Sequence, residues 1–209
     1  MNIAIPPLAR RLGARQADQL IVLLHGVGAT AESLAPVADH LLRFRDSTAA
    51  VLLEAPQPFD GGGSGRQWFS VAGVTEANRA ERVVAALPPL WARLDRLVAD
   101  EGLDASRLVL LGFSQGAILT LASAALGRSF GAGVALSGRL ANAPAPAHAG
   151  SPRLLIAHGA EDRVIPPTEG RRAAEQLSKA GFDARFEPRP KLGHGVNTDE
   201  LDRVAAFLG

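Results

Sequence analysis

The chain has 209 residues, of which 47% are hydrophobic and 21% charged, a composition typical of a globular domain rather than of a disordered chain. Lys plus Arg (22) nearly balance Asp plus Glu (21), so there is neither a basic stripe for nucleic acid nor a polybasic patch for anionic lipid. The chain has no cysteine, which excludes disulfides, a thiol nucleophile and sulfur-based zinc sites. We therefore expect a single domain over residues 1–209.

The distribution of apolar residues disfavours two further classes, proteins with a signal peptide and integral membrane proteins. The segment Met1–Gln16 has no apolar stretch of the length that a signal peptide needs. No apolar run approaches the roughly 18 residues of a membrane span. We expect a cytoplasmic protein without integral membrane association, and its oligomeric state stays open, with a homodimer as one alternative.

Short, continuous apolar runs alternate with segments of helical periodicity along the whole chain. Such runs are typical of strands buried on both faces of a parallel sheet. The predicted strands are Gln19–His25, Ala49–Ala55, Arg107–Phe113, Ala132–Ser137, Arg153–His158 and, more weakly marked, Ala184–Pro188.

The segments between these runs predict helices. The first helix begins after Thr30 and ends near Phe44, and a second begins at Thr75 and is expected to kink or break at Pro88 and Pro89. Later helices are predicted from near Ala117, over Thr168–Ala180 before Gly181, and after Asn197 or Thr198. The alternation predicts a three-layer α/β sandwich, in which ligands bind beyond the carboxyl ends of the strands.

The motif Gly112-Phe113-Ser114-Gln115-Gly116 lies between a predicted strand and a predicted helix. A glycine-flanked serine at such a sharp turn is typical of a nucleophile whose Oγ is exposed. The alternative is a glycine-rich packing turn. If Ser114 is the nucleophile, it needs a histidine base, which an acid orients, and the chain order is serine, acid, histidine.

Candidates for the base and the acid follow downstream. His194 lies in a glycine-flanked loop before the last predicted helix, where a solvent-reachable base would be placed, whereas His158 ends a strand and is interpreted as structural. Asp162 follows the strand Arg153–His158 and is the preferred acid, with Glu161 as the second candidate.

Backbone donors for a developing oxyanion are expected from two loops. One is the N–H of Gln115, directly after the serine, and the other is that of Val27 in the turn His25-Gly26-Val27-Gly28. The glycine-rich segment Gly61–Phe69 delivers Trp68 and Phe69, which either wall an acyl pocket or anchor the loop to the core. His25 is interpreted as structural.

Five blocks together resemble the phospholipase/carboxylesterase family of serine hydrolases: LLHGVG from Leu23, GRQWFSVAGVTEANR from Gly65, LLGFSQGA from Leu110, HGAEDRVIP from His158 and LGH from Leu192. The family includes acyl-protein thioesterases, and the chain looks closest to a small bacterial carboxylesterase branch. The resemblance implies an α/β-hydrolase fold, with a mostly parallel central sheet and helices on both faces. It also implies a triad of Ser114, Asp162 and His194, and oxyanion donors at Val27 and Gln115.

The resemblance further implies that Trp68 borders the substrate site, with Phe69 as its neighbour. Many relatives carry an aspartate after this aromatic pair, where this chain has Ser70. The loop Gly138–Gly150 is too short for a cap domain, so we expect an open, shallow site.

We expect a serine carboxylesterase that hydrolyses short- to medium-chain carboxylic esters through an acyl-enzyme and needs no metal or organic cofactor. One alternative is an acyl-protein thioesterase or lysophospholipase acting on longer acyl chains. Another is a catalytically idle binding protein of the same fold.

Overall fold

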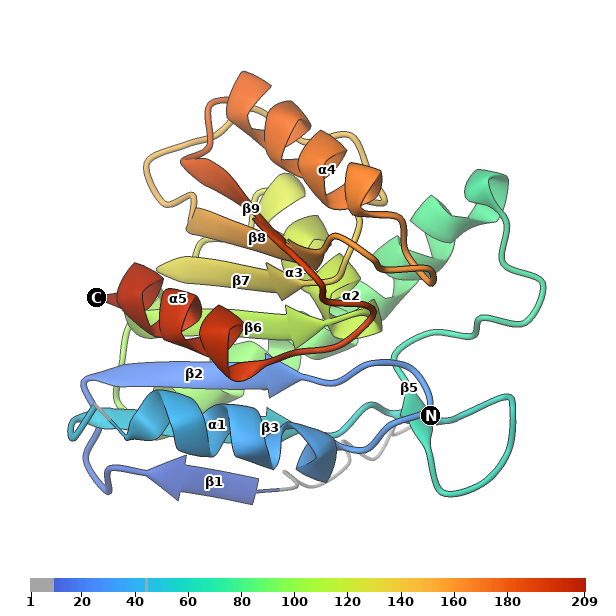
Figure 1. Ribbon diagram of the computed structural model, residues 1–209. Coiled ribbons are helices and arrows are strands. Elements are labelled where there is room, and N and C mark those ends of the chain that lie inside the picture. Colours follow the sequence, from blue (N-terminus) through green and yellow to red (C-terminus); the bar gives the residue numbers. More distant parts are fainter. Residues whose placement is uncertain (1–9, 44) are drawn as a thin grey trace.

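The computed structural model describes residues 10–43 and 45–209. Phe44, the predicted end of the first helix, and residues 1–9 of the segment considered for a targeting signal lie outside them. A seven-stranded sheet with the order β1-β3-β2-β6-β7-β8-β9 forms the centre (Figure 1). Its strands are β1 (Arg10–Gly13), β2 (Gln19–Leu24), β3 (Thr48–Leu53), β6 (Leu108–Phe113), β7 (Ala132–Leu136), β8 (Arg153–Gly159) and β9 (Ala184–Arg189).

All neighbouring strands are parallel except β1, which pairs antiparallel with β3 at one edge. The six predicted strands are confirmed, with ends that differ by one or two residues. The edge strand β1 and the two-stranded ribbon of β4 (Gln57–Pro58) and β5 (Arg66–Gln67) were not predicted. Their sequences are too short and too polar to show strand periodicity.

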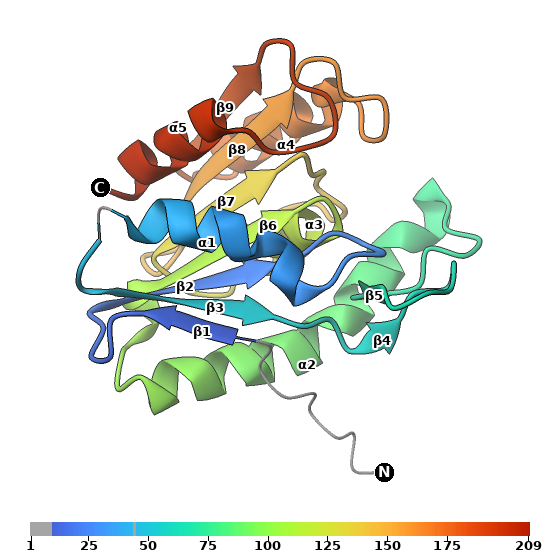
Figure 2. The same cartoon turned by 60° about the horizontal axis from the view of Figure 1, so that its bottom comes forward.

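Helices cover both faces of the sheet (Figure 2). On one face lie α1 (Ala35–Leu42), preceded by the 3₁₀ turn η1 (Ala31–Leu34), and α5 (Thr198–Leu208). On the other face lie α2 (Glu76–Asp100), α3 (Gln115–Ala125) and α4 (Pro167–Lys179). A second 3₁₀ turn, η2 (Ala105–Arg107), leads into β6.

The alternation of side chains in β2 shows how the two faces are filled. Leu20, Val22 and Leu24 pack among the residues of α2, α3 and α4, whereas Ile21 and Leu23 pack among those of α1 and α5. All five are fully buried. A strand covered on both sides must be apolar at every position, which explains why these strands read as continuous runs.

Two expectations about helices are corrected. The predicted break at Pro88 and Pro89 is wrong, because α2 is one helix of 25 residues that contains both prolines. Both prolines are exposed, so the carbonyl groups that lose their helical partners face solvent and can be hydrated. The helix after the serine motif begins at Gln115, two residues before the predicted position.

The carboxyl ends of the parallel strands all lie at the same end of the sheet, and the loops that follow them lie there as well. The segment 138–150 after β7 contains no helix or strand, so it forms no cap domain. Within the described part of the chain, no helix combines the length and the apolar character needed to cross a membrane.

Candidate active site

Ser114 lies in a strained turn between β6 and α3. Its backbone angles are φ 51 and ψ −111, outside the regions that non-glycine residues prefer. The conformation is held on both sides, because the Ser114 N–H donates to the Leu136 carbonyl (2.9 Å) and the Ile118 N–H donates to the Ser114 carbonyl (3.1 Å). The predicted sharp strand-to-helix turn is thus present.

The flanking glycines are required by crowding. A Cβ on Gly112 would lie 2.2 Å from the carbonyl carbon of Gly116, and a Cβ on Gly116 would lie 2.0 Å from the Leu24 carbonyl oxygen. Backbone atoms at these distances cannot make room, so only glycine fits at either position. The start of α3 therefore packs directly against the end of β2.

A chain of hydrogen bonds joins three side chains that lie far apart in the sequence. His194 Nε2 lies 3.0 Å from Ser114 Oγ, and His194 Nδ1 lies 2.7 Å from Asp162 Oδ2. Asp162 is 5% exposed and Ser114 is 7% exposed. Glu161, the second candidate for the acid, is exposed and makes no side-chain hydrogen bond to a described residue. The structure thus brings Asp162, and not Glu161, to the histidine.

The surroundings of Asp162 keep it ionised. Its Oδ1 accepts hydrogen bonds from the N–H groups of Val164 (2.8 Å) and Ile165 (3.0 Å). Burial acts to raise the pKa of Asp162, but the hydrogen bond from His194 and the two backbone donors outweigh it and lower the pKa below its ordinary value. A carboxylate that stays charged can accept from His194 Nδ1–H and hold the ring in one tautomer.

His158 contacts Asp162 and the backbone that follows it. Its Nε2 lies 2.8 Å from the Ile165 carbonyl and 3.2 Å from Asp162 Oδ2, and the His158 side chain is fully buried. The interpretation of His158 as structural was right, but the sequence did not reveal the contact with Asp162. The i,i+4 spacing of the two residues was the available signal.

The loop after β2 is fixed so that one N–H group stays without a partner. The Gly28 N–H donates to the Arg66 carbonyl (2.8 Å), and the Arg66 N–H donates to the Ala29 carbonyl (2.8 Å). No acceptor among the described residues takes the N–H of Val27, nor that of Gln115 at the start of α3. A Cβ on Gly26 would lie 3.3 Å from Ser114 Cβ, so this loop and the serine are neighbours.

Trp68 and Phe69 are almost completely buried, at 3% and 5% exposure. Trp68 Nε1 donates to the His25 carbonyl (2.9 Å), which ties the aromatic pair to the end of β2. This is the anchoring arrangement that composition alone left as an alternative. Contact of either side chain with substrate stays a prediction.

The side chain of Gln115 connects the serine turn to the aromatic pair, which sequence reasoning missed. Its Oε1 accepts from the Trp68 N–H (2.8 Å), and its Nε2 donates to the Phe69 carbonyl (2.7 Å). Gln115 is 3% exposed. One residue thus presents its N–H beside Ser114 and holds the neighbouring loop with its amide.

His25 is fully buried, directly after β2. Burial lowers its pKa, and its Nδ1 lies 2.7 Å from the Gly26 carbonyl while Nε2 lies 3.2 Å from the Ala55 N–H. These contacts fit the tautomer in which Nδ1 donates and Nε2 accepts. His25 therefore fixes the backbone immediately before Val27, in agreement with its interpretation as structural.

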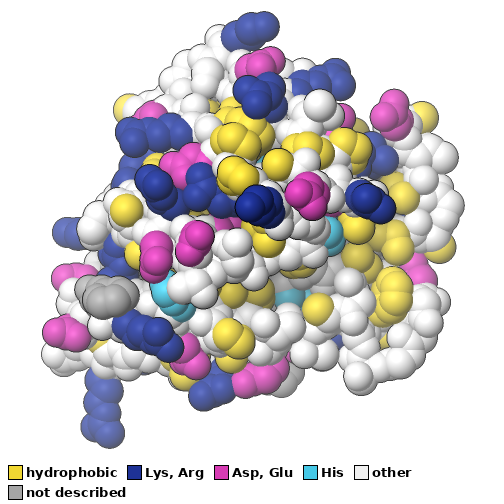
Figure 3. Space-filling view, viewed as in Figure 1, with side chains coloured by type: hydrophobic (Ala, Val, Ile, Leu, Met, Phe, Trp, Pro, Cys, Tyr) yellow, Lys and Arg dark blue, Asp and Glu magenta, His cyan; other side chains and the backbone are white. Residues whose placement is uncertain are grey.

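A groove of about 680 Å³ begins at His194 and Phe113 and runs between α1 and the start of α5. Its apolar walls include Leu34, Val37 and Val196. Figure 3 shows histidine and hydrophobic side chains gathered at a hollow on this face of the molecule. Among residues 10–43 and 45–209, no group of three or more His, Asp or Glu side chains could hold a metal ion.

The family to which this site belongs follows from comparison with known proteins. The model of the phospholipase/carboxylesterase family matches residues 11–209. Esterase YpfH of Escherichia coli is 34% identical over 188 residues, covering 90% of this chain and 80% of that protein. Acyl-protein thioesterase 1 of Gibberella zeae is 28% identical, covering 93% of this chain and 91% of that protein.

A comparison with solved structures points to the same group of proteins as the comparison of sequences. The crystal structure of esterase PE8 superposes with a TM-score of 0.86 at 30% identity, covering 95% of this chain and 96% of that one. The expected α/β-hydrolase fold is thereby confirmed. The chain belongs to the phospholipase/carboxylesterase family and is a carboxylic ester hydrolase.

Proposed function

We propose that the protein hydrolyses short- to medium-chain carboxylic esters with Ser114 as the nucleophile, His194 as the base and Asp162 as the orienting acid. The observation that carries the proposal is the continuous path of 3.0 Å and 2.7 Å contacts from Ser114 Oγ through the imidazole to the buried carboxylate. The strained backbone of Ser114 supports the proposal, because non-glycine residues with strained backbone angles occur mainly at functional sites.

The reaction then follows from the positions of these groups. Ser114 Oγ attacks the carbonyl carbon while its proton passes to His194 Nε2, and Asp162 stabilises the resulting imidazolium. Collapse of the tetrahedral intermediate expels the alcohol, which takes the proton from His194. A water molecule, deprotonated by the same nitrogen, attacks the acyl carbon. The bond from that carbon to Ser114 Oγ then breaks as the oxygen takes the proton back from His194, which releases the acid and restores the enzyme.

We assign the oxyanion to the N–H groups of Val27 and Gln115. Gln115 directly follows Ser114, and the loop that carries Val27 packs against Ser114 at Gly26. Neither N–H group has a hydrogen-bond acceptor among the described residues. The bridge between Arg66 and the loop, together with the His25 contacts, holds Val27 in place before substrate arrives. Such preorganised donors are worth about 3–4 kcal/mol each to the transition state.

The groove beside His194 is suited to the acyl chain. Its volume of about 680 Å³ is within the range of small-molecule sites, and its apolar walls begin next to the base. Polar side chains, including Ser33 and Asn197, also line it, which favours short and medium chains over long ones. An acyl-protein thioesterase or lysophospholipase activity on long chains is the second candidate, and the acyl-protein thioesterase relative favours it.

The proposal is tested with p-nitrophenyl esters from acetate to palmitate, using the wild type, Ser114→Ala and the control Ser178→Ala. Ser178 lies on α4, is exposed and only donates to the Ala184 carbonyl. We expect activity to peak at short or medium chains, to vanish in Ser114→Ala and to persist in the control. A peak at palmitate would favour the second candidate.

A catalytically idle binding protein gives a different result. An organophosphonate probe should label the wild type at Ser114, because the hydroxyl is activated by His194. Absence of labelling, together with absence of serine-dependent hydrolysis of every ester, would refute the catalytic assignment.

A further inference from the structure

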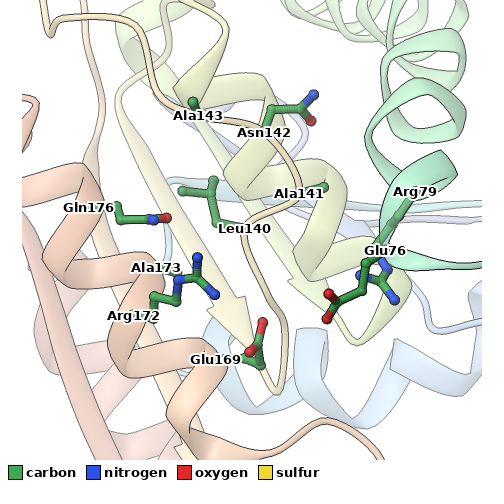
Figure 4. A pocket seen from close by; sticks show the side chains of 10 residues that line it. All are labelled: Glu76, Arg79, Leu140, Ala141, Asn142, Ala143, Glu169, Arg172, Ala173 and Gln176. Carbon is green, nitrogen blue, oxygen red and sulfur yellow. The ribbon is translucent and has the colours of Figure 1, made fainter.

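A second hollow, of about 300 Å³, lies beyond the carboxyl ends of the strands, between the first turn of α2 and one side of α4 (Figure 4). The loop that carries Leu140 and Ala141 crosses between the two helices. Polar side chains from three segments line it: Glu76 and Arg79 from α2, Glu169, Arg172 and Gln176 from α4, and Asn142 from the loop.

The charges of this hollow are not paired with one another. Each helix carries a glutamate followed three residues later by an arginine, Glu76 with Arg79 and Glu169 with Arg172, a spacing that permits an ion pair. Yet none of the four makes an ion pair within 4.0 Å, or any side-chain hydrogen bond, with a described residue. Acidic and basic side chains therefore both line the hollow without an ion pair to one another or to another described residue.

Asn142 also lines the hollow and carries an unpaired acceptor. Its Oδ1 is buried and has no hydrogen-bond partner. A buried acceptor without a donor costs about 1–3 kcal/mol, so a donor supplied to it would be favourable. Asn142 Oδ1 lacks a donor, as do the two glutamates, whereas the two arginines lack an acceptor.

The loop that lines the hollow also contacts the helix that begins after Ser114. The loop follows β7 directly, and a Cβ on Gly138 would lie 2.5 Å from the Cβ of Ala117, three residues after Ser114. Burial and the Arg79 guanidinium lower the pKa of Arg139, which precedes the lining residues. Nearby carboxylates raise this pKa in opposition, first Glu169 and Glu76 of the hollow and then Asp162.

We propose that this hollow, defined by Glu76, Arg79, Asn142, Glu169 and Arg172, binds a small zwitterionic group of the amino-acid type on the ester substrate. The carboxylate of such a group fits the planar donors of the arginines. Its ammonium supplies three donors to the glutamates and to Asn142 Oδ1. A neutral ligand would desolvate the four charges without compensating them, and a singly charged ligand would compensate only one sign.

The inference rests on the proposed function, because it assigns the alcohol portion of the ester to this hollow and the acyl portion to the groove beside His194. The test uses the acetyl esters of homoserine and three of its derivatives: O-acetylhomoserine, its N-acetyl derivative, its amide and its N-acetyl amide. They are zwitterionic, anionic, cationic and neutral respectively, and the ester bond is the same in all four.

We expect kcat/KM for the zwitterion to exceed that for the neutral ester by about tenfold or more, with the singly charged esters between them. Arg172→Gln and Glu169→Gln should each reduce this ratio by about fivefold or more. The matched control is Arg171→Gln, since Arg171 is the next residue on α4 but lies over the Phe186 ring at 4.8 Å from its centroid. This control should leave the ratio unchanged.

Equal rates on all four esters, or equal effects of Arg171→Gln and Arg172→Gln, would overturn the inference and leave the esterase proposal intact. If no ester is hydrolysed in a Ser114-dependent manner, the proposed function fails instead. The hollow is then judged by ligand-observed NMR on the wild type. Saturation transfer to homoserine, but not to N-acetylhomoserinamide, supports the zwitterion site, and absence of transfer to both refutes it.

Discussion

Gln115→Met separates the two roles of Gln115, because it keeps the backbone N–H beside Ser114 and removes the side-chain amide. The amide makes two hydrogen bonds, at 2.8 Å from the Trp68 N–H and 2.7 Å to the Phe69 carbonyl. In the variant both backbone groups stay buried without a partner, at about 1–3 kcal/mol each, while Met conserves most of the volume. We expect the free energy of unfolding to fall by about 3 kcal/mol or more.

The consequence for activity follows from the same contacts. Trp68 is hydrogen-bonded to the His25 carbonyl, two residues before Val27, so a shift of the aromatic pair displaces the proposed oxyanion loop. A misplacement of about 1 Å can reduce turnover by about 100-fold, so we expect a loss of about tenfold or more in kcat.

The assay is denaturant unfolding together with steady-state hydrolysis of one ester for wild type, Gln115→Met and the control Gln57→Met. Gln57 lies in β4, is exposed and makes no side-chain hydrogen bond to a described residue. For a chain of this size, 3 kcal/mol corresponds to a fall in Tm of about 6–12 °C. The reasoning is refuted if Gln115→Met loses less than about 1 kcal/mol relative to the control.

Three further outcomes are expected. Ser114→Gly should abolish activity but have a free energy of unfolding about 1 kcal/mol larger than that of Ser114→Ala, because glycine adopts φ 51 without strain. Equal stability of the two variants in denaturant would contradict this. Burial raises the pKa of Glu200 from 4.5 to about 7, and Arg189 acts in the opposite direction. The protein is therefore most stable with respect to Glu200 below pH 4.5, and this contribution declines as the pH rises to about 7. Glu200→Gln should therefore flatten this decline, by about 3 kcal/mol between pH 4 and pH 8, and an unchanged pH profile of unfolding would refute it. His158→Phe should lower kcat by about 10- to 100-fold with little change in KM, since it removes a contact of 3.2 Å to Asp162; unchanged kinetics would show that the backbone donors suffice.

The sequence predicted the architecture well because each central strand is buried on both faces. Such strands must be apolar at every position, and the runs in β2, β3 and β6 are therefore visible without any tertiary information. The polar edge strand β1 and the uninterrupted course of α2 through Pro88 and Pro89 were not visible. Both depend on which side of an element faces solvent.

The site was predicted in part for a related reason. Crowding between β6 and α3 demands glycine at both sides of Ser114, and this local requirement leaves a motif in the sequence. The choice of Asp162 over Glu161 was made on the sequence, and the geometry agrees with it, because Asp162 is the buried carboxylate at 2.7 Å from His194.

The sequence by itself therefore determined the parallel sheet, the strained serine turn and the residue types of the proposed triad, because burial and local crowding restrict which amino acids fit. Only the tertiary structure decided how distant segments meet: the amide of Gln115 on the Trp68 loop, His158 on Asp162, and the unpaired charges of α2 and α4 around one hollow. Contacts of this kind depend on side-chain directions across elements far apart in the chain. No local pattern encodes them.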